Sequence, residues 1–141
     1  MALDVELLRS TFDLVIHRQP NLTHVFYEDL FDKHPEARAL FVRRPPEVQE
    51  QMLAEALVAA LDHLEDAAWL SEHLGALGAQ HADYGVTETM YGWVAASLLA
   101  TLADVAGPDW TPAAESAWSD AIDAVASLML AGYPRAAEAT A

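Results

Sequence analysis

One tyrosine and one histidine, far apart in the sequence, each lie in a short run that also contains aromatic or other apolar residues. Tyr27 lies in the run Phe-Tyr-Glu-Asp-Leu-Phe at 26–31, and His81 begins the run His-Ala-Asp-Tyr-Gly-Val at 81–86. A neutral imidazole suits iron as an axial ligand, and a phenol can donate a hydrogen bond to a ligand of that iron. Two helices that carry one such group each, across an apolar gap, can hold a flat iron macrocycle. We interpret the pair as a haem pocket.

His81 is a candidate metal ligand because it lies on a leucine stripe. The second nitrogen of a ligating imidazole donates to another group, and the carbonyl of Leu77, about one turn earlier, is the expected acceptor. His73 is the rival on the same segment, and we expect it to be exposed. Taken alone, a histidine at the end of a leucine stripe is more often a core or surface residue.

Composition and charge exclude several other classes of protein. The 141 residues are 53% hydrophobic, enough for a single domain spanning 1–141 with a sizeable core. Seven basic against 22 acidic side chains give a net charge of −15, which disfavours nucleic acid and anionic membranes as partners. Cysteine is absent, so disulfides, zinc thiolates and iron–sulfur clusters are excluded. We found no signal peptide and no stretch approaching the ~20 apolar residues of a membrane span, so we expect a cytoplasmic protein.

Apolar residues recur at helical spacing almost throughout, and no strand pattern competes, which predicts an all-α protein. Gly75 and Gly78 would weaken their helix, and they suggest the close approach of a neighbouring segment or a ligand. Thr87 and Thr111 are expected helix caps. The predicted helices run from about Leu3 to Ile16, Asn21 to His34, Pro35 to Leu40, Gln49 to Ala60 and Leu70 to His81. Two longer ones follow, from Thr87 through Leu102 until Gly107-Pro108, and from Thr111 through Met129 until Gly132 and Pro134.

Several separated motifs keep a shared spacing. They are Phe26-Tyr27-x-x-Leu30-Phe31-x-x-His34-Pro35-Glu36-x-Arg38-x-Leu40-Phe41, His81-x-x-Tyr84-Gly85-Val86 with Tyr91 ten positions after His81, and the turn at 105–112. Over essentially the whole chain this resembles the single-domain bacterial haemoglobins and the haem domain of flavohaemoglobins. The resemblance implies a globin fold, with helices packed around haem b. It also implies His81 as the proximal ligand, Tyr27 as the distal tyrosine, Phe41 as a haem-packing residue, and a distal glutamine.

Two glutamines lie near the distal position. Counting forward from Tyr27 favours Gln51, whereas counting back 32 residues from His81 favours Gln49, which also places Leu53 four residues later on the same stripe. A connector shortened by two residues near Arg43 would reconcile the counts, because loops absorb deletions that helices do not. We take Gln49 as the pocket residue.

Other residues are assigned to the pocket through the same resemblance. Arg43 or Arg44 would meet the haem propionates, and Tyr91 would support the proximal histidine. The family commonly adds a glutamate to that support, but counting fifteen residues from Trp118 leads here to Tyr133. Trp93 is bulky and would narrow the surroundings of the haem. The expected apolar walls are Phe41, Leu53, Leu57, Val86, Val94, Leu98 and Met129, each of which is equally explained as ordinary core.

Three functions are compatible with the pocket. The first is reversible oxygen binding coupled to nitric oxide dioxygenation, with electrons from a separate reductase, since the sequence contains no glycine-rich dinucleotide motif. The second is a non-enzymatic oxygen carrier, store or sensor. The third is an interaction domain of globin shape without haem, against which Tyr27 and His81 argue. The sequence does not define the oligomeric state.

Overall fold

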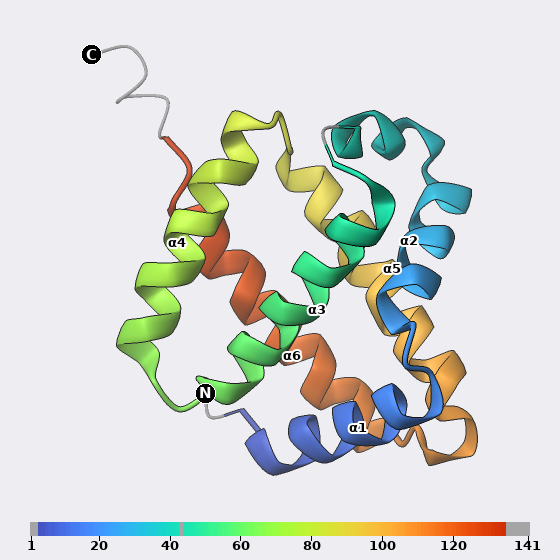
Figure 1. The fold of residues 1–141 in the computed structure, drawn as a ribbon. Coiled ribbons are helices and arrows are strands. Elements are labelled where there is room, and N and C mark those ends of the chain that lie inside the picture. The colour runs from blue at the N-terminus through green and yellow to red at the C-terminus, as the bar shows by residue number, and fades with distance from the viewer. Residues whose placement is uncertain (1–2, 43, 135–141) are drawn as a thin grey trace.

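The structure is a computed structural model that describes residues 3–42 and 44–134. Within these ranges the fold contains α-helices and short 3₁₀ helices and no strands, which confirms the all-α prediction (Figure 1). The observed boundaries lie within a few residues of the expected ones. The helices are α1 (Val5–Arg18), α2 (Leu22–Lys33), η1 (Pro35–Phe41), α3 (Pro46–Asp62), α4 (Ala67–Asp83), α5 (Glu88–Ala106), η2 (Gly107–Asp109) and α6 (Pro112–Ala131).

The boundaries follow from local chemistry. The hydroxyl of Thr111 accepts a hydrogen bond from the backbone N–H of Ala114 at 3.1 Å, and Pro112 occupies the first turn of α6. Such a cap satisfies one of the amides that the first turn leaves unpaired, and proline loses nothing there. Gly107, at φ 55°, ends α5 in a conformation that favours glycine.

The main hydrophobic core lies where α1, α2, α5 and α6 meet, together with the end of α3. Figure 1 shows α5 and α6 running behind the other helices, with α1 across one end. The most deeply buried large side chains of this core are Leu8, Val15, Leu22, Leu30 and Leu102. A second, smaller core cluster consists of Leu70, Leu74 and Met129, between α4 and α6.

Helices α4 and α6 make the most extensive helix pair in the fold, and glycine permits their close approach. A Cβ atom on Gly78 would lie only 1.8 Å from the carbonyl oxygen of Met129, and one on Gly132 would lie 2.0 Å from that of Gly75. The expected close approach at Gly78 is therefore confirmed, and the neighbour is α6. A Cβ atom on Gly75 would meet nothing within 4 Å.

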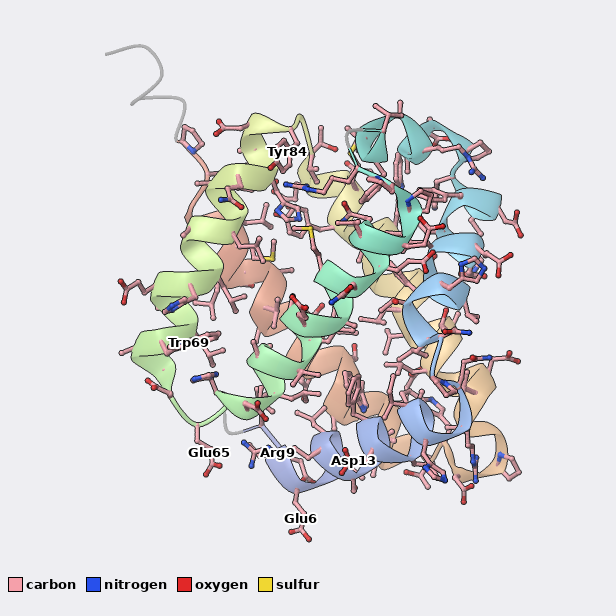
Figure 2. The ribbon with its side chains drawn as sticks, viewed as in Figure 1. Glu6, Arg9, Asp13, Glu65, Trp69 and Tyr84 are labelled. Atoms are coloured by element: carbon pink, nitrogen blue, oxygen red, sulfur yellow. The ribbon has the colours of Figure 1, made fainter. Side chains whose placement is uncertain are left out.

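Helix α3 buries little of its apolar surface. Leu61 is the one buried residue in this 17-residue helix, whereas Met52 and Val58 are 42% and 45% exposed. Arg9 of α1 donates to the carbonyl oxygen of Leu61 at 2.9 and 3.1 Å and also approaches Glu65 (Figure 2). The C-terminal end of α3 is thus held to α1. Its N-terminal half packs on α2, and the described residues of α3 and α4 pack little against each other.

One expectation about membrane spans is wrong. The segment Glu88–Asp109, which contains α5, has a mean hydropathy of 1.3 and is long and apolar enough, by length and composition, to cross a membrane. In the fold, however, α5 packs against α1, α2 and α6. A core helix passes the same test, because it needs apolar residues on several faces for packing.

Candidate haem-binding site

Tyr27 lies on α2 inside a cluster of aromatic rings. Its ring centroid is 5.0 Å from that of Phe26, 5.7 Å from that of Phe31 and 5.3 Å from that of Phe41. The side chain is 7% exposed, and burial raises the pKa of the Tyr27 phenol above its ordinary value. The phenol therefore stays protonated at neutral pH and remains a hydrogen-bond donor.

Gln49 is the glutamine that meets Tyr27. Its amide nitrogen donates to the Tyr27 hydroxyl oxygen at 3.2 Å. Gln51 is exposed and instead donates to Glu55 at 3.1 Å, on the outer face of α3. Because the phenol oxygen accepts from Gln49, the hydroxyl hydrogen of Tyr27 is left to donate to a further partner.

His81 lies near the end of α4, with its ring held in one orientation. Its Nδ1 atom is 2.8 Å from the carbonyl oxygen of Leu77, the expected acceptor. A carbonyl only accepts, so this bond places the hydrogen on Nδ1 and leaves a lone pair on Nε2. The rival His73 is exposed, as expected, and its Nδ1 bonds to the carbonyl oxygen of Trp69 at 2.9 Å.

Two hydrogen-bonded tyrosines, Tyr91 and Tyr133, lie near His81. The Tyr91 ring centroid lies 6.3 Å from that of His81, and the Tyr133 hydroxyl lies 3.0 Å from that of Tyr91 and 2.9 Å from the carbonyl oxygen of Val86. Each phenol has one hydrogen, so Tyr133 donates to the carbonyl and Tyr91 donates to Tyr133. Burial, then this bond, raises the pKa of Tyr91 well above its ordinary value.

Helix α5 joins the two sides of the candidate site. Tyr91 belongs to the smaller core cluster, near His81, whereas Trp93 packs on the main core and stacks on the ring of His34 at 4.2 Å. On the helical surface of α5, Val94 lies between Tyr91 and Trp93, and it is 37% exposed. The Tyr27 side and the His81 side thus belong to separate core clusters, both reached by the first turns of α5.

These residues fit a haem. His81 offers one nitrogen lone pair, and among the described residues no three histidine or carboxylate side chains gather as a protein-only metal site. An iron held by His81 would need its other ligands from a macrocycle. Helices α3 and α5 also carry partly exposed apolar side chains, which are suited to contact a flat apolar ring. They are Leu53, Leu57 and Met52 of α3 and Val94 of α5.

The other residues predicted to contact the haem or its propionates differ in how far they are buried. Leu98 and Met129 are buried among protein side chains, at 8% exposure each, and Val86 lies half-buried in the turn after α4. Arg44 is exposed and has no partner among the described residues, which suits a group that would meet a propionate. Arg43 lies outside the described residues.

Two features of the site were not predicted. Phe31 stacks on Tyr27 and touches Phe41, and its i, i+4 spacing from Tyr27 on one helix is a signal that would have indicated this. His24 of α2 bonds to Glu50 of α3 beside the Tyr27–Gln49 contact. No sequence signal indicates that pairing, because it depends on how the two helices dock.

The fold and these residues define the class of the protein. A family model described as Globin matches residues 24–129, which is most of the chain. The chain therefore belongs to the globin family, as the sequence motifs had indicated, and membership of this family implies haem binding.

Within the family, similar curated proteins include flavohaemoproteins. That of Rhodopirellula baltica is 27% identical over 128 residues, and that of Bacillus thuringiensis subsp. konkukian is 29% identical over 129 residues; each match covers 89% of this chain. The flavohaemoprotein of Vibrio cholerae is 28% identical over 119 residues, 83% of this chain. The chain spans 30–31% of the length of these relatives.

Solved structures agree with this assignment. One is a nitric oxide dioxygenase candidate from Rhodothermus marinus that was engineered as a carbene transferase. It has a TM-score of 0.78 and 27% identity, with 99% of this chain and 95% of that chain covered. Another is a bacterial globin from Campylobacter jejuni, with a TM-score of 0.72, 26% identity, and coverage of 89% and 92%.

Proposed function

We propose that this globin binds haem b through His81, holds oxygen beside Tyr27 and Gln49, and supports nitric oxide dioxygenation when a reductase supplies electrons. Two observations support the proposal: the imidazole of His81 on α4 is held in one orientation, and the buried phenol of Tyr27 on α2 accepts a hydrogen bond from Gln49 on α3. His81 would hold the haem, which would supply an iron able to bind a gaseous ligand.

The distal residues would act on the oxygen molecule by hydrogen bonding. Gln49 donates to the phenol oxygen of Tyr27, which makes the phenol a better donor and points its hydrogen away from the amide. The rings of Phe26, Phe31 and Phe41 surround the Tyr27 ring, and Tyr27 is 7% exposed. A hydrogen bond in such a buried environment is stronger than one exposed to water.

The dioxygenation itself needs three components. One nitric oxide molecule, one oxygen molecule and one electron together give one nitrate ion, so turnover depends on an electron donor. The flavohaemoprotein relatives and the Rhodothermus marinus structure support this activity for the present chain. We propose a separate reductase as the partner. The single-domain organisation and the cytoplasmic location remain predictions from the sequence.

A non-enzymatic oxygen carrier, store or sensor is the second candidate. It is favoured by the neutral group behind His81: Tyr91 and Tyr133 bond to each other and to the Val86 carbonyl, and among the described residues no carboxylate joins them. A neutral network withdraws the imidazole proton less than a carboxylate would, so His81 would give less electron density to iron.

The cofactor is tested by absorption spectroscopy and by extraction of the haem, which identifies haem b. His81→Ala should abolish or severely weaken haem binding, whereas His73→Ala, an exposed histidine on the same helix, should leave the spectrum unchanged. A native spectrum in His81→Ala would refute the ligand assignment. Nitrate formation from oxygen and nitric oxide with an added flavin reductase then separates the dioxygenase from the carrier.

A further inference from the structure

Two polar contacts stand side by side where α2 meets α3. One joins Gln49 to Tyr27 at 3.2 Å, and the other joins Nδ1 of His24 to a carboxylate oxygen of Glu50 at 2.8 Å. His24 lies three residues before Tyr27, on the same face of α2, and Glu50 directly follows Gln49 on α3. The two contacts therefore join adjacent residues of α3 to one face of α2.

The N-terminal half of α3 depends on these contacts more than its C-terminal half does. At the C-terminal end, Leu61 is buried and its carbonyl accepts two hydrogen bonds from Arg9. Near the N-terminal end no residue is fully buried, and Gln49 and Glu50 are half-buried. A polar contact contributes more to the position of a segment that little apolar burial holds in place.

We propose that His24 and Glu50 form a proton-dependent clamp that holds Gln49 against Tyr27 and so sets how firmly the distal side retains oxygen. This inference rests on the proposed function of the same site, and it assigns His24 and Glu50 as positioning residues. With the clamp closed, Gln49 donates to the phenol oxygen and leaves the phenol hydrogen for oxygen. With the clamp open, that alignment is lost and oxygen leaves faster.

The charges around His24 give the direction of the pH dependence. Glu50 is the strongest influence, through its hydrogen bond and its charge, followed by Glu28 on the same helix, 3.3 Å from Nε2, and Glu47 on α3. Among the described residues, no charged group of α5 or η1 acts on His24. These carboxylates raise the pKa of His24 above its ordinary value of 6.5.

The raised pKa of His24 decides at which pH the clamp is closed. Because the folded-state pKa is raised, the clamp is fully formed below pH 6.5 and is lost as the pH rises through the folded-state pKa. Oxygen release should therefore be slower in mildly acidic solution and faster in mildly alkaline solution. The His24 side chain is 54% exposed, so the change should be modest, about two- to fivefold, as for other exposed ion pairs.

The experiment measures oxygen release from the haem-loaded protein by stopped flow across this pH range, in parent, Glu50→Gln and Glu55→Gln. Glu50→Gln should release oxygen at the fast, alkaline rate of the parent at every pH. Glu55→Gln is the matched control, since Glu55 is an exposed carboxylate on the same helix that contacts Gln51, and it should reproduce the parent curve. Identical curves in parent and Glu50→Gln would overturn the clamp.

An NMR titration of the His24 ring gives a second readout that does not depend on oxygen. The pKa of His24 should lie above 6.5 in the parent and in Glu55→Gln, and should fall in Glu50→Gln. An unchanged His24 pKa in Glu50→Gln would also overturn the clamp. If no variant binds haem or oxygen, the proposed function fails instead. The titration, with hydrogen exchange of the Gln49 side-chain amide measured at each pH, then still decides whether the clamp exists.

Discussion

Gly78→Ala is expected to separate α4 from α6. The added Cβ atom would lie 1.8 Å from the Met129 carbonyl oxygen and 2.5 Å from its carbonyl carbon. Ordinary contact begins near 3.4 Å, so the two backbones must move apart by about 1.6 Å (3.4 − 1.8 = 1.6). The opposing atoms are backbone, and therefore no side-chain rotation relieves the clash.

The effect of Gly78→Ala on the free energy of unfolding has three contributions. Alanine in place of glycine would by itself favour the helix by up to about 1 kcal/mol. Overpacking a close helix contact costs about 1–3 kcal/mol, and partial exposure of Leu70, Leu74 and Met129 adds about 2 kcal/mol if a third of their burial is lost. The net expectation is a destabilisation of about 2–4 kcal/mol.

Urea unfolding followed by circular dichroism measures this change, with Gly75→Ala as the matched control. Gly75 lies in the interior of the same helix, but a Cβ atom there meets nothing within 4 Å. Gly75→Ala should therefore stabilise the protein by about 0.4–1 kcal/mol. His81 follows Gly78 by three residues, so Gly78→Ala should also release haem faster to an acceptor protein. A Gly78→Ala protein as stable as its parent would refute the reasoning.

Three further results are expected. Tyr27→Phe should speed oxygen release roughly tenfold or more, because a buried hydrogen bond of about 1–3 kcal/mol is lost; an unchanged stopped-flow rate would remove the phenol from the distal role. Gln49→Leu should also speed release, whereas Gln51→Leu, which alters an exposed side chain, should not. Tyr133→Glu should react faster with peroxide and show a stronger iron–histidine band in resonance Raman spectra. A variant indistinguishable from the parent would separate Tyr133 from the proximal ligand His81.

Interactions between residues close in the sequence determined much of the fold, and such interactions could be predicted from the sequence. The helix ends at Thr111 and Gly107 follow from a side-chain cap and a backbone conformation, each of which involves only neighbouring residues. The bond from His81 to the carbonyl of Leu77 spans four residues of one helix, so spacing alone anticipated it. The family was likewise predictable, because its motifs keep their separation along the chain.

Contacts between helices required the tertiary structure. Residue separations from Tyr27 and from His81 did not decide between Gln49 and Gln51, because the connector before α3 sets how that helix is rotated against α2. In the structure Gln49 bonds to Tyr27, whereas Gln51 bonds to Glu55. The same docking brings His24 to Glu50. Two glycines three residues apart looked equivalent, yet only a side chain at Gly78 would meet the α6 backbone. Such pairings depend on helix rotation and separation, which residues distant in the sequence decide jointly through packing.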